Sequence, residues 1–159
     1  MRRILLTLIA TIALTVAAGA RTLREYTAMP LPGARYPFTL TVDSIDFRSD
    51  LVRIYGHLLS TPHSSARIDG FTVSEGDKVL APADMKSYPA NDIDGFEFTH
   101  RFQWEDDGDL PVEIDFPAFK PQNAFLISAA TPSGPVVWAL RRTSSAKSTK
   151  GTKAVKHAK

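Results

Sequence analysis

Three histidines, His57, His63 and His100, are the residues in the middle of the chain that most often carry chemistry. A metal site built on imidazoles needs three or four converging ligands with hydrogen-bonded support. These histidines are scattered along the chain, so they could converge only if the fold brought them together. We therefore expect no metal site, with His57 facing solvent and His100 hydrogen-bonded in or at the rim of the core. The alternative is a small exported hydrolase or metal-handling protein that uses these surface histidines.

Serine-based catalysis requires a hydroxyl beside a base, together with an oxyanion hole. The sequence has many serines, but it has no Gly-x-Ser-x-Gly elbow, no Ser-x-x-Lys helix and no His-Glu-x-x-His motif. The run SAKSTK does combine serine with lysine, yet it lies near the end of the chain with no core to hold it in place. The sequence also has no cysteine, which excludes thiolate chemistry. We predict no catalytic residue and no cofactor.

An acidic cluster, Glu105, Asp106, Asp107 and Asp109, carries the oxygen ligands that calcium prefers. Its spacing differs from the alternating pattern of an EF-hand loop. The pair Asp107-Gly108 is typical of a hairpin turn, because both residues tolerate a positive φ angle. We interpret the cluster as a solvated turn.

Trp104 directly precedes this cluster, at the end of a stripe formed with Phe96, Phe98 and Phe102. Aromatic rings bury a large apolar area, so such a stripe normally belongs to a core. A ring at a strand end can also emerge toward solvent. We expect a core stripe and keep the alternative that Trp104 faces a ligand.

The C-terminal segment has a lysine at every third position: Lys147, Lys150, Lys153, Lys156 and Lys159. Its composition of alanine, serine, threonine, glycine and lysine predicts a disordered tail, because too little apolar surface is available for burial. On a polyproline-II-like chain the lysines would align in one row, whereas on an α-helix they would spread around the axis. The expected partner is an anionic envelope polymer or membrane surface, and nucleic acid is a less favoured partner. The alternative is a tail that only increases solubility.

The charge of the chain is divided between two parts. From Arg21 to Ala146 there are 12 basic and 17 acidic residues, a net charge of −5, and the five tail lysines contribute +5. The formal charge of +2 for the whole chain therefore describes neither part. An acidic body with a basic tail indicates that the tail is the part directed at an anionic partner.

Apolar and polar residues alternate through most of the chain after Phe38, which predicts β-strands. The clearest strands cover residues 51–59, 96–104 and 110–116, and two more precede and follow the turn TPSG. The turn at Asp107-Gly108 is expected to join residues 96–104 and 110–116 as a hairpin. Residues 83–95 show no helix period and are expected to be irregular.

Seven or eight short strands without a helix predict an all-β domain, and the favoured fold is an immunoglobulin-like β-sandwich over residues 37–142. A small closed β-barrel is the alternative. Without disulfides, the domain must be stabilised by burial and hydrogen bonds. The predicted core includes Phe98, Phe102, Val112, Ile114 and Trp138.

The N-terminus has the pattern of a secretory signal peptide. Two arginines precede the 13-residue apolar run from Ile4 to Val16, and Ala18-Gly19-Ala20 fits a signal peptidase. We expect residues 1–20 to be removed, residues 21–36 to form an extended proline-rich lead-in, and residues 143–159 to form the basic tail. The alternative is an N-terminal membrane anchor.

These features together predict an exported protein of the periplasm or extracellular space. We expect a non-catalytic module of the cell envelope with a binding or structural role, which its flexible cationic tail tethers to an anionic polymer or membrane surface.

Overall fold

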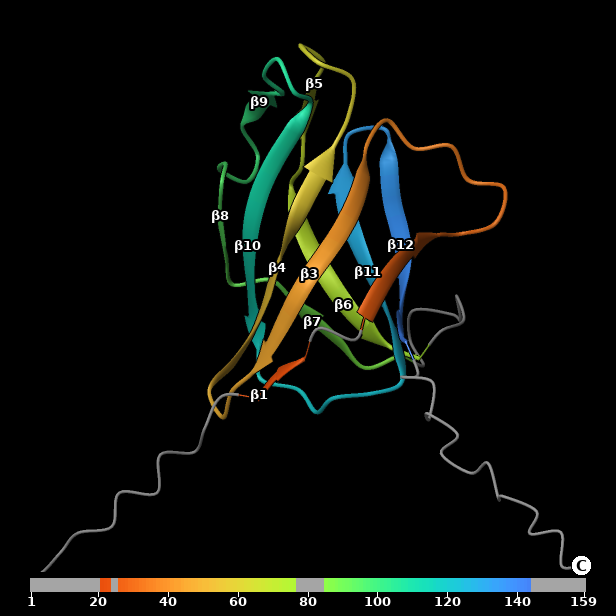
Figure 1. Ribbon diagram of the computed structural model, residues 1–159, viewed down its shortest axis with the longest axis vertical. Coiled ribbons are helices and arrows are strands. Elements are labelled where there is room, and N and C mark those ends of the chain that lie inside the picture. Colours follow the sequence, from red (N-terminus) through yellow and green to blue (C-terminus); the bar gives the residue numbers. More distant parts are fainter. Residues whose placement is uncertain (1–20, 24–25, 77–84, 144–159) are drawn as a thin grey trace, which may run out of the picture.

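The computed structural model describes residues 21–23, 26–76 and 85–143, and their strands form three antiparallel sheets (Figure 1). The first sheet has the order β1-β3-β4-β10-β8, with bounds Arg21–Leu23, Thr39–Phe47, Leu51–Leu59, Asp109–Pro117 and Asp92–Asp94. The second has the order β2-β12-β11-β6-β7, with bounds Tyr26–Pro30, Gly134–Arg142, Ala124–Thr131, Gly70–Glu75 and Ser87–Pro89. A small third sheet pairs β5 (Ser65–Arg67) with β9 (Arg101–Gln103). Within the described ranges there is no helix of the length and apolarity needed to cross a membrane.

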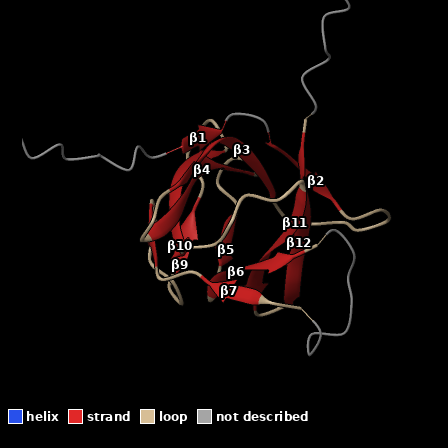
Figure 2. Ribbon diagram, turned by 90° about the horizontal axis from the view of Figure 1, so that it is seen from below, coloured by secondary structure: helices blue, strands red, loops and turns tan. Residues whose placement is uncertain are grey.

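The two five-stranded sheets lie face to face, as the view from below makes clear (Figure 2). None of the sheets formed by the described strands closes into a barrel. The prediction of an all-β protein is confirmed, and the alternative of a closed barrel is wrong.

The body has two ends, which we call the base and the top. At the base, β3, β6, β10 and β12 end and β4, β7 and β11 begin, whereas the top carries the small sheet of β5 and β9 (Figure 1). The described chain ends at Thr143, directly after β12, and therefore leaves the body at the base.

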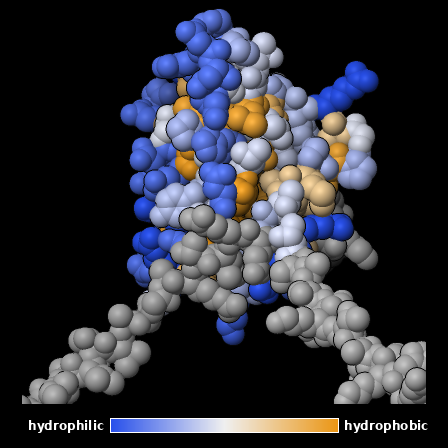
Figure 3. All heavy atoms as spheres, in the orientation of Figure 1, coloured by the Kyte–Doolittle hydropathy of each residue, from blue (hydrophilic) through white to orange (hydrophobic). Residues whose placement is uncertain are grey.

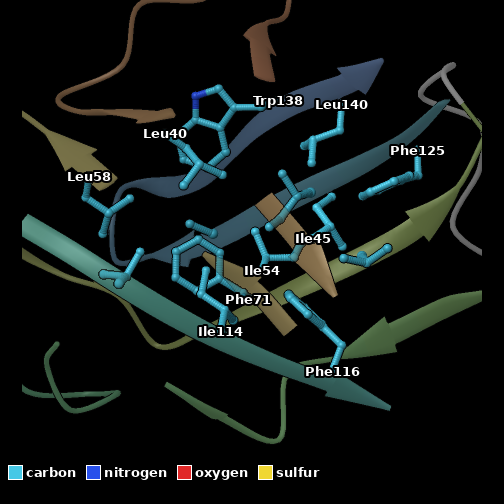
Figure 4. Packing of buried hydrophobic residues seen from close by; sticks show 14 of the residues in the cluster. Leu40, Ile45, Ile54, Leu58, Phe71, Ile114, Phe116, Phe125, Trp138 and Leu140 are labelled. Carbon is cyan, nitrogen blue, oxygen red and sulfur yellow. The ribbon is translucent and has the colours of Figure 1, made fainter. Parts of the chain in front are cut away.

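The hydrophobic core fills the space between the two large sheets (Figure 4). Along β4 the buried side chains Val52, Ile54 and Leu58 alternate with half-buried ones, because successive residues of a strand point to opposite faces. β10 repeats the pattern with Val112 and Ile114. The second sheet contributes Phe71, Phe125, Ile127, Trp138 and Leu140.

The strand predicted over residues 96–104 is wrong in its first half. Only Arg101–Gln103 is a strand, and Thr99 has a φ angle of 67°, a left-handed conformation that a continuous strand cannot contain. Phe98 and Phe102 are only partly buried, contrary to the prediction, whereas Val112, Ile114 and Trp138 lie in the core as predicted.

The two predicted turns differ in outcome. Gly108 does adopt a positive φ of 66°, but β9 pairs with β5 whereas β10 pairs with β4 and β8. The turn therefore connects two different sheets, and the predicted hairpin is wrong. By contrast, β11 and β12 form a hairpin across the turn TPSG, in which Gly134 has a φ of 114°.

Residues 21–36 are more regular than the predicted lead-in. They contain β1, which pairs with β3 in the first sheet, and β2, which pairs with β12 in the second. Residues 83–95, expected to be irregular, contain the short strands β7 and β8. The expected signal peptide, residues 1–20, and the tail lysines lie outside the described residues.

Candidate functional site

His57 lies near the centre of the outer face of the first sheet, between two aspartates from neighbouring strands. Its Nδ1 is 2.7 Å from Oδ1 of Asp109 on β10, and its Nε2 is 3.0 Å from Oδ2 of Asp43 on β3. Asp43 is the extra residue of a β-bulge, because the register of β3 against β4 shifts between Val42 and Ser44. A bulge redirects the side chain that it contains, which accounts for an aspartate at this place. The imidazole thus links three strands.

The two carboxylates favour the charged form of the imidazole. The hydrogen bond to Asp109 raises the pKa of His57 above its ordinary value, partial burial opposes this rise, and the charges of Asp109 and Asp43 add to it. When the ring is protonated, both nitrogens donate to carboxylates and neither is available as a general base or a metal ligand. The geometry therefore favours a structural role for His57.

A hollow of about 400 Å³ lies beside His57. It is lined by Asp43, Tyr55, Gly56, His57, Asp94, Gly95, Pro111, Val112 and Glu113. None of these described residues is a serine, threonine, lysine or cysteine, the common partners of a histidine in nucleophilic catalysis.

Arg53 precedes His57 by four residues on β4 and lies on the same face of the sheet. Acidic residues of β10 bind its guanidinium. Its Nε and Nη2 lie 2.6 and 2.7 Å from the two oxygens of Asp115, and its Nη1 lies 3.1 Å from Glu113. The hydrogen bonds to Asp115 raise the pKa of Arg53 further above its usual range, so the guanidinium stays charged. Hydrophilic residues cover the side of the molecule that carries β10 (Figure 3). This face is a network of charges that connects β4 to its neighbours.

The other histidines do not join His57. His63 lies 3.3 Å from Asp106 and His100 lies 3.3 Å from Glu97, and both imidazoles are mostly exposed. His100 therefore lies on the surface, outside the core in which it was expected as one option. Among the described residues, no group of three or more histidines, aspartates or glutamates is placed to hold a metal ion.

The acidic cluster forms a turn whose side chains diverge. Asp109 reaches His57 and Asp106 reaches His63, while Asp107 accepts the backbone N–H of Asp109. The carboxylates are thus directed to separate partners within the turn.

Trp104, considered as a ring facing a ligand, is placed in the core instead. Its exposure is 1%, and its indole N–H donates to the carbonyl oxygen of Leu58 at 2.7 Å. The ring packs against Phe38 and Phe102, with centroid distances of 5.7 and 4.9 Å. The core interpretation of this tryptophan is the correct one.

Sequence alternation already placed Arg53, Tyr55 and His57 on one face of a strand, and Glu113 and Asp115 on another. The alternation does not reveal the register that brings these strands together, or the bulge at Asp43.

Comparisons with protein-family models, with curated proteins and with solved structures found no match to the chain.

We predict that His57 stabilises the fold most strongly at low pH. A histidine with a raised pKa contributes its full stabilisation below the ordinary pKa of about 6.5, and loses it as the pH rises through the raised value. His57→Gln should cost about 0.5–1 kcal/mol at pH 5.5, because the ring is partly exposed, and much less at pH 9. Urea unfolding across this range measures the difference.

The groups facing His57 from other strands are Asp43, Asp94, Asp109 and Glu113, together with Tyr55 on its own strand. His100→Gln serves as the control, because that imidazole is 72% exposed and pairs with Glu97, three residues away in the same loop. A cost for His57→Gln that is constant with pH would contradict the prediction.

Proposed function

We propose that the protein is an exported, non-catalytic module of the cell envelope with an immunoglobulin-like β-sandwich fold. Its lysine tail would hold it at an anionic polymer or membrane surface, in the periplasm or outside the cell after removal of residues 1–20.

The immunoglobulin-like assignment is supported by strand order. In such folds, strands A, B, E and D form one sheet and strands C, F and G, with C′ in some members, form the other. Here β3, β4, β10 and β8 occupy the first set of positions in space and in chain order. β6, β7, β11 and β12 occupy those of C, C′, F and G. β1 and β2 are additions before strand A.

The main support for the tether proposal is the position at which β12 ends, because the tail lysines follow this strand in the sequence. β12 ends at the base with the exposed residues Arg141 and Arg142, and the tail lysines follow from there. The acidic turn of Glu105, Asp106 and Asp107 lies at the other end of β10, at the top. A strand of nine residues spans about 30 Å, whereas the Debye length is about 8 Å at physiological ionic strength. The acidic turn would therefore not repel a surface that contacts the base.

The test compares the chain from Arg21 to Lys159 with a chain that ends at Thr143. We expect the full tail to increase binding to vesicles containing anionic lipid at least tenfold at low salt, because each lysine near such a surface contributes about 1 kcal/mol. High salt should abolish the difference. Neutral vesicles are the reference surface, and purified envelope polymer is the second anionic one.

A variant with all five tail lysines replaced by glutamine keeps the length of the tail and provides the matched control. Equal binding by the full and shortened chains would contradict the tether. Tighter binding to DNA than to either envelope surface would also contradict the proposed location of its partner.

A further inference from the structure

A second hollow, of about 680 Å³, lies at the base of the body. Four segments of the described chain line it: the turn between β3 and β4, the end of β6, the beginning of β7, and the connection from β10 to β11. Its volume falls within the range of small-molecule binding pockets in proteins. We call it the base pocket.

The base pocket is basic, although the body as a whole is acidic. Among the described residues that line it, Arg48, Lys86 and Lys120 come from three different segments, and Glu75, at the end of β6, is the one carboxylate. Glu75 accepts a hydrogen bond from the hydroxyl of Tyr88 at 2.8 Å. Within the described part of the chain, no carboxylate lies within 4 Å of the amino group of Lys86 or Lys120. The described part of the lining therefore carries an excess of positive charge.

Arg48 has donors to spare. Its Nη2 lies 3.2 Å from Asp46, which is largely buried, and its Nε is buried with no hydrogen-bond partner in the described structure. A guanidinium has five N–H donors in a planar fork suited to carboxylate and phosphate oxygens. Buried donors without acceptors are rare and unfavourable. A small turn of this side chain, which is 35% exposed, would let an acceptor in the pocket satisfy them.

Two aromatic residues that line the base pocket are held in place by packing against the core. Tyr88 and Phe119 pack with ring centroids 5.1 Å apart, and Phe119 in turn contacts Phe47 and Phe125 in the core. The amino group of Lys86 lies over the ring of Tyr88, 5.3 Å from its centroid. A cation supported in this way is preorganised, so less freedom is lost when a ligand binds.

From these contacts we infer that the base pocket binds an oxyanion, a carboxylate or a phosphate group, through Arg48, Lys86 and Lys120. The site belongs to the folded body and does not depend on the proposed tail tether. It would give the body its own recognition of an anionic ligand at the end where the tail begins. Such recognition would add specificity to a tail that attracts any polyanion.

The experiment is an NMR titration of the ¹⁵N-labelled chain from Arg21 to Lys159. The probes are glucose 6-phosphate, glucuronate and inorganic phosphate, with glucose as the neutral reference. Binding in the base pocket should shift the amide signals of Ser49, Tyr88 and Lys120, whereas binding to the tail would shift those of the tail lysines. The two proposals can therefore fail separately. Comparing the three anions shows whether the group recognised is a carboxylate or a phosphate, free or carried on a sugar.

The variant Lys86→Gln/Lys120→Gln should weaken the affinity at the pocket about tenfold, because it removes two exposed charges. Lys86→Arg/Lys120→Arg should retain binding. Arg35→Gln/Arg101→Gln removes the same charge from exposed positions outside the pocket and should leave the affinity unchanged. Absence of shifts at the pocket with all three anions, or equal weakening by the two glutamine pairs, would overturn the inference.

Discussion

Gly56→Ala is expected to destabilise the protein by about 3 kcal/mol, toward the upper end of the cost of overpacking. Gly56 lies on β4 opposite Val42, beside the bulge in β3. A Cβ atom added to it would lie 2.1 Å from the carbonyl oxygen of Thr41 and 3.3 Å from the Cα of Val42. These are backbone atoms of a paired strand, so no side-chain rotation can relieve the clash.

Gly70→Ala is the matched control for this substitution. Gly70 begins β6, and a Cβ atom built on it has no heavy atom within 4 Å. Its φ angle is not positive, so alanine should fit and can even stabilise slightly by restricting the unfolded chain. Urea unfolding of the two variants gives the comparison. Similar stabilities would show that β3 yields easily at the bulge, contrary to our expectation.

Trp104→Ala is expected to cost about 3–5 kcal/mol, the usual range for a fully buried aromatic residue. The substitution leaves a cavity between Phe38 and Phe102 and deprives the Leu58 carbonyl of the indole donor. Phe102→Ala should cost clearly less, because Phe102 is only partly buried at the side of the core.

Trp104→Phe separates packing from hydrogen bonding in this prediction. It keeps most of the buried ring but leaves the Leu58 carbonyl without its partner, which should cost about 1–3 kcal/mol. Chemical unfolding measures all three variants. A cost for Trp104→Ala no greater than that for Phe102→Ala would contradict the burial of Trp104 in the core.

The parts of the fold that were predictable depend on local pattern. In β4 and β10 the period of two runs without interruption, so the sequence placed Ile54 and Ile114 on the buried face correctly. The hairpin of β11 and β12 was marked by Gly134, whose positive φ the turn requires.

The same alternation wrongly indicates a strand over residues 96–100. Its aromatic residues alternate as in a strand, but they are held by one another: Phe96 stacks on Phe102 at 4.3 Å and contacts Phe98 at 6.1 Å. Thr99 can adopt its left-handed conformation because tertiary contacts fix it, including a hydrogen bond from its N–H to Ile68. The alternation of residues in the sequence does not reveal these tertiary contacts.

The candidate sites depend on contacts between distant segments. Asp109 is far from His57 in sequence and meets it only through the register of β4 and β10. The base pocket likewise draws Arg48, Lys86 and Lys120 from three connections. Charged residues in loops look alike in a sequence, so neither cluster could be foreseen from residue type and spacing.

The strand order has a consequence for how the protein behaves at high concentration. The outermost strands of the two large sheets are β1, β8, β2 and β7, and none of them exceeds five residues. β2 and β7 end in Pro30 and Pro89, and β8 carries Asp92 and Asp94. Short edges that carry proline or charge are poor templates for adding a strand from another chain. These four strands are therefore poor sites for edge-to-edge aggregation, although the described secondary structure consists of β-strands.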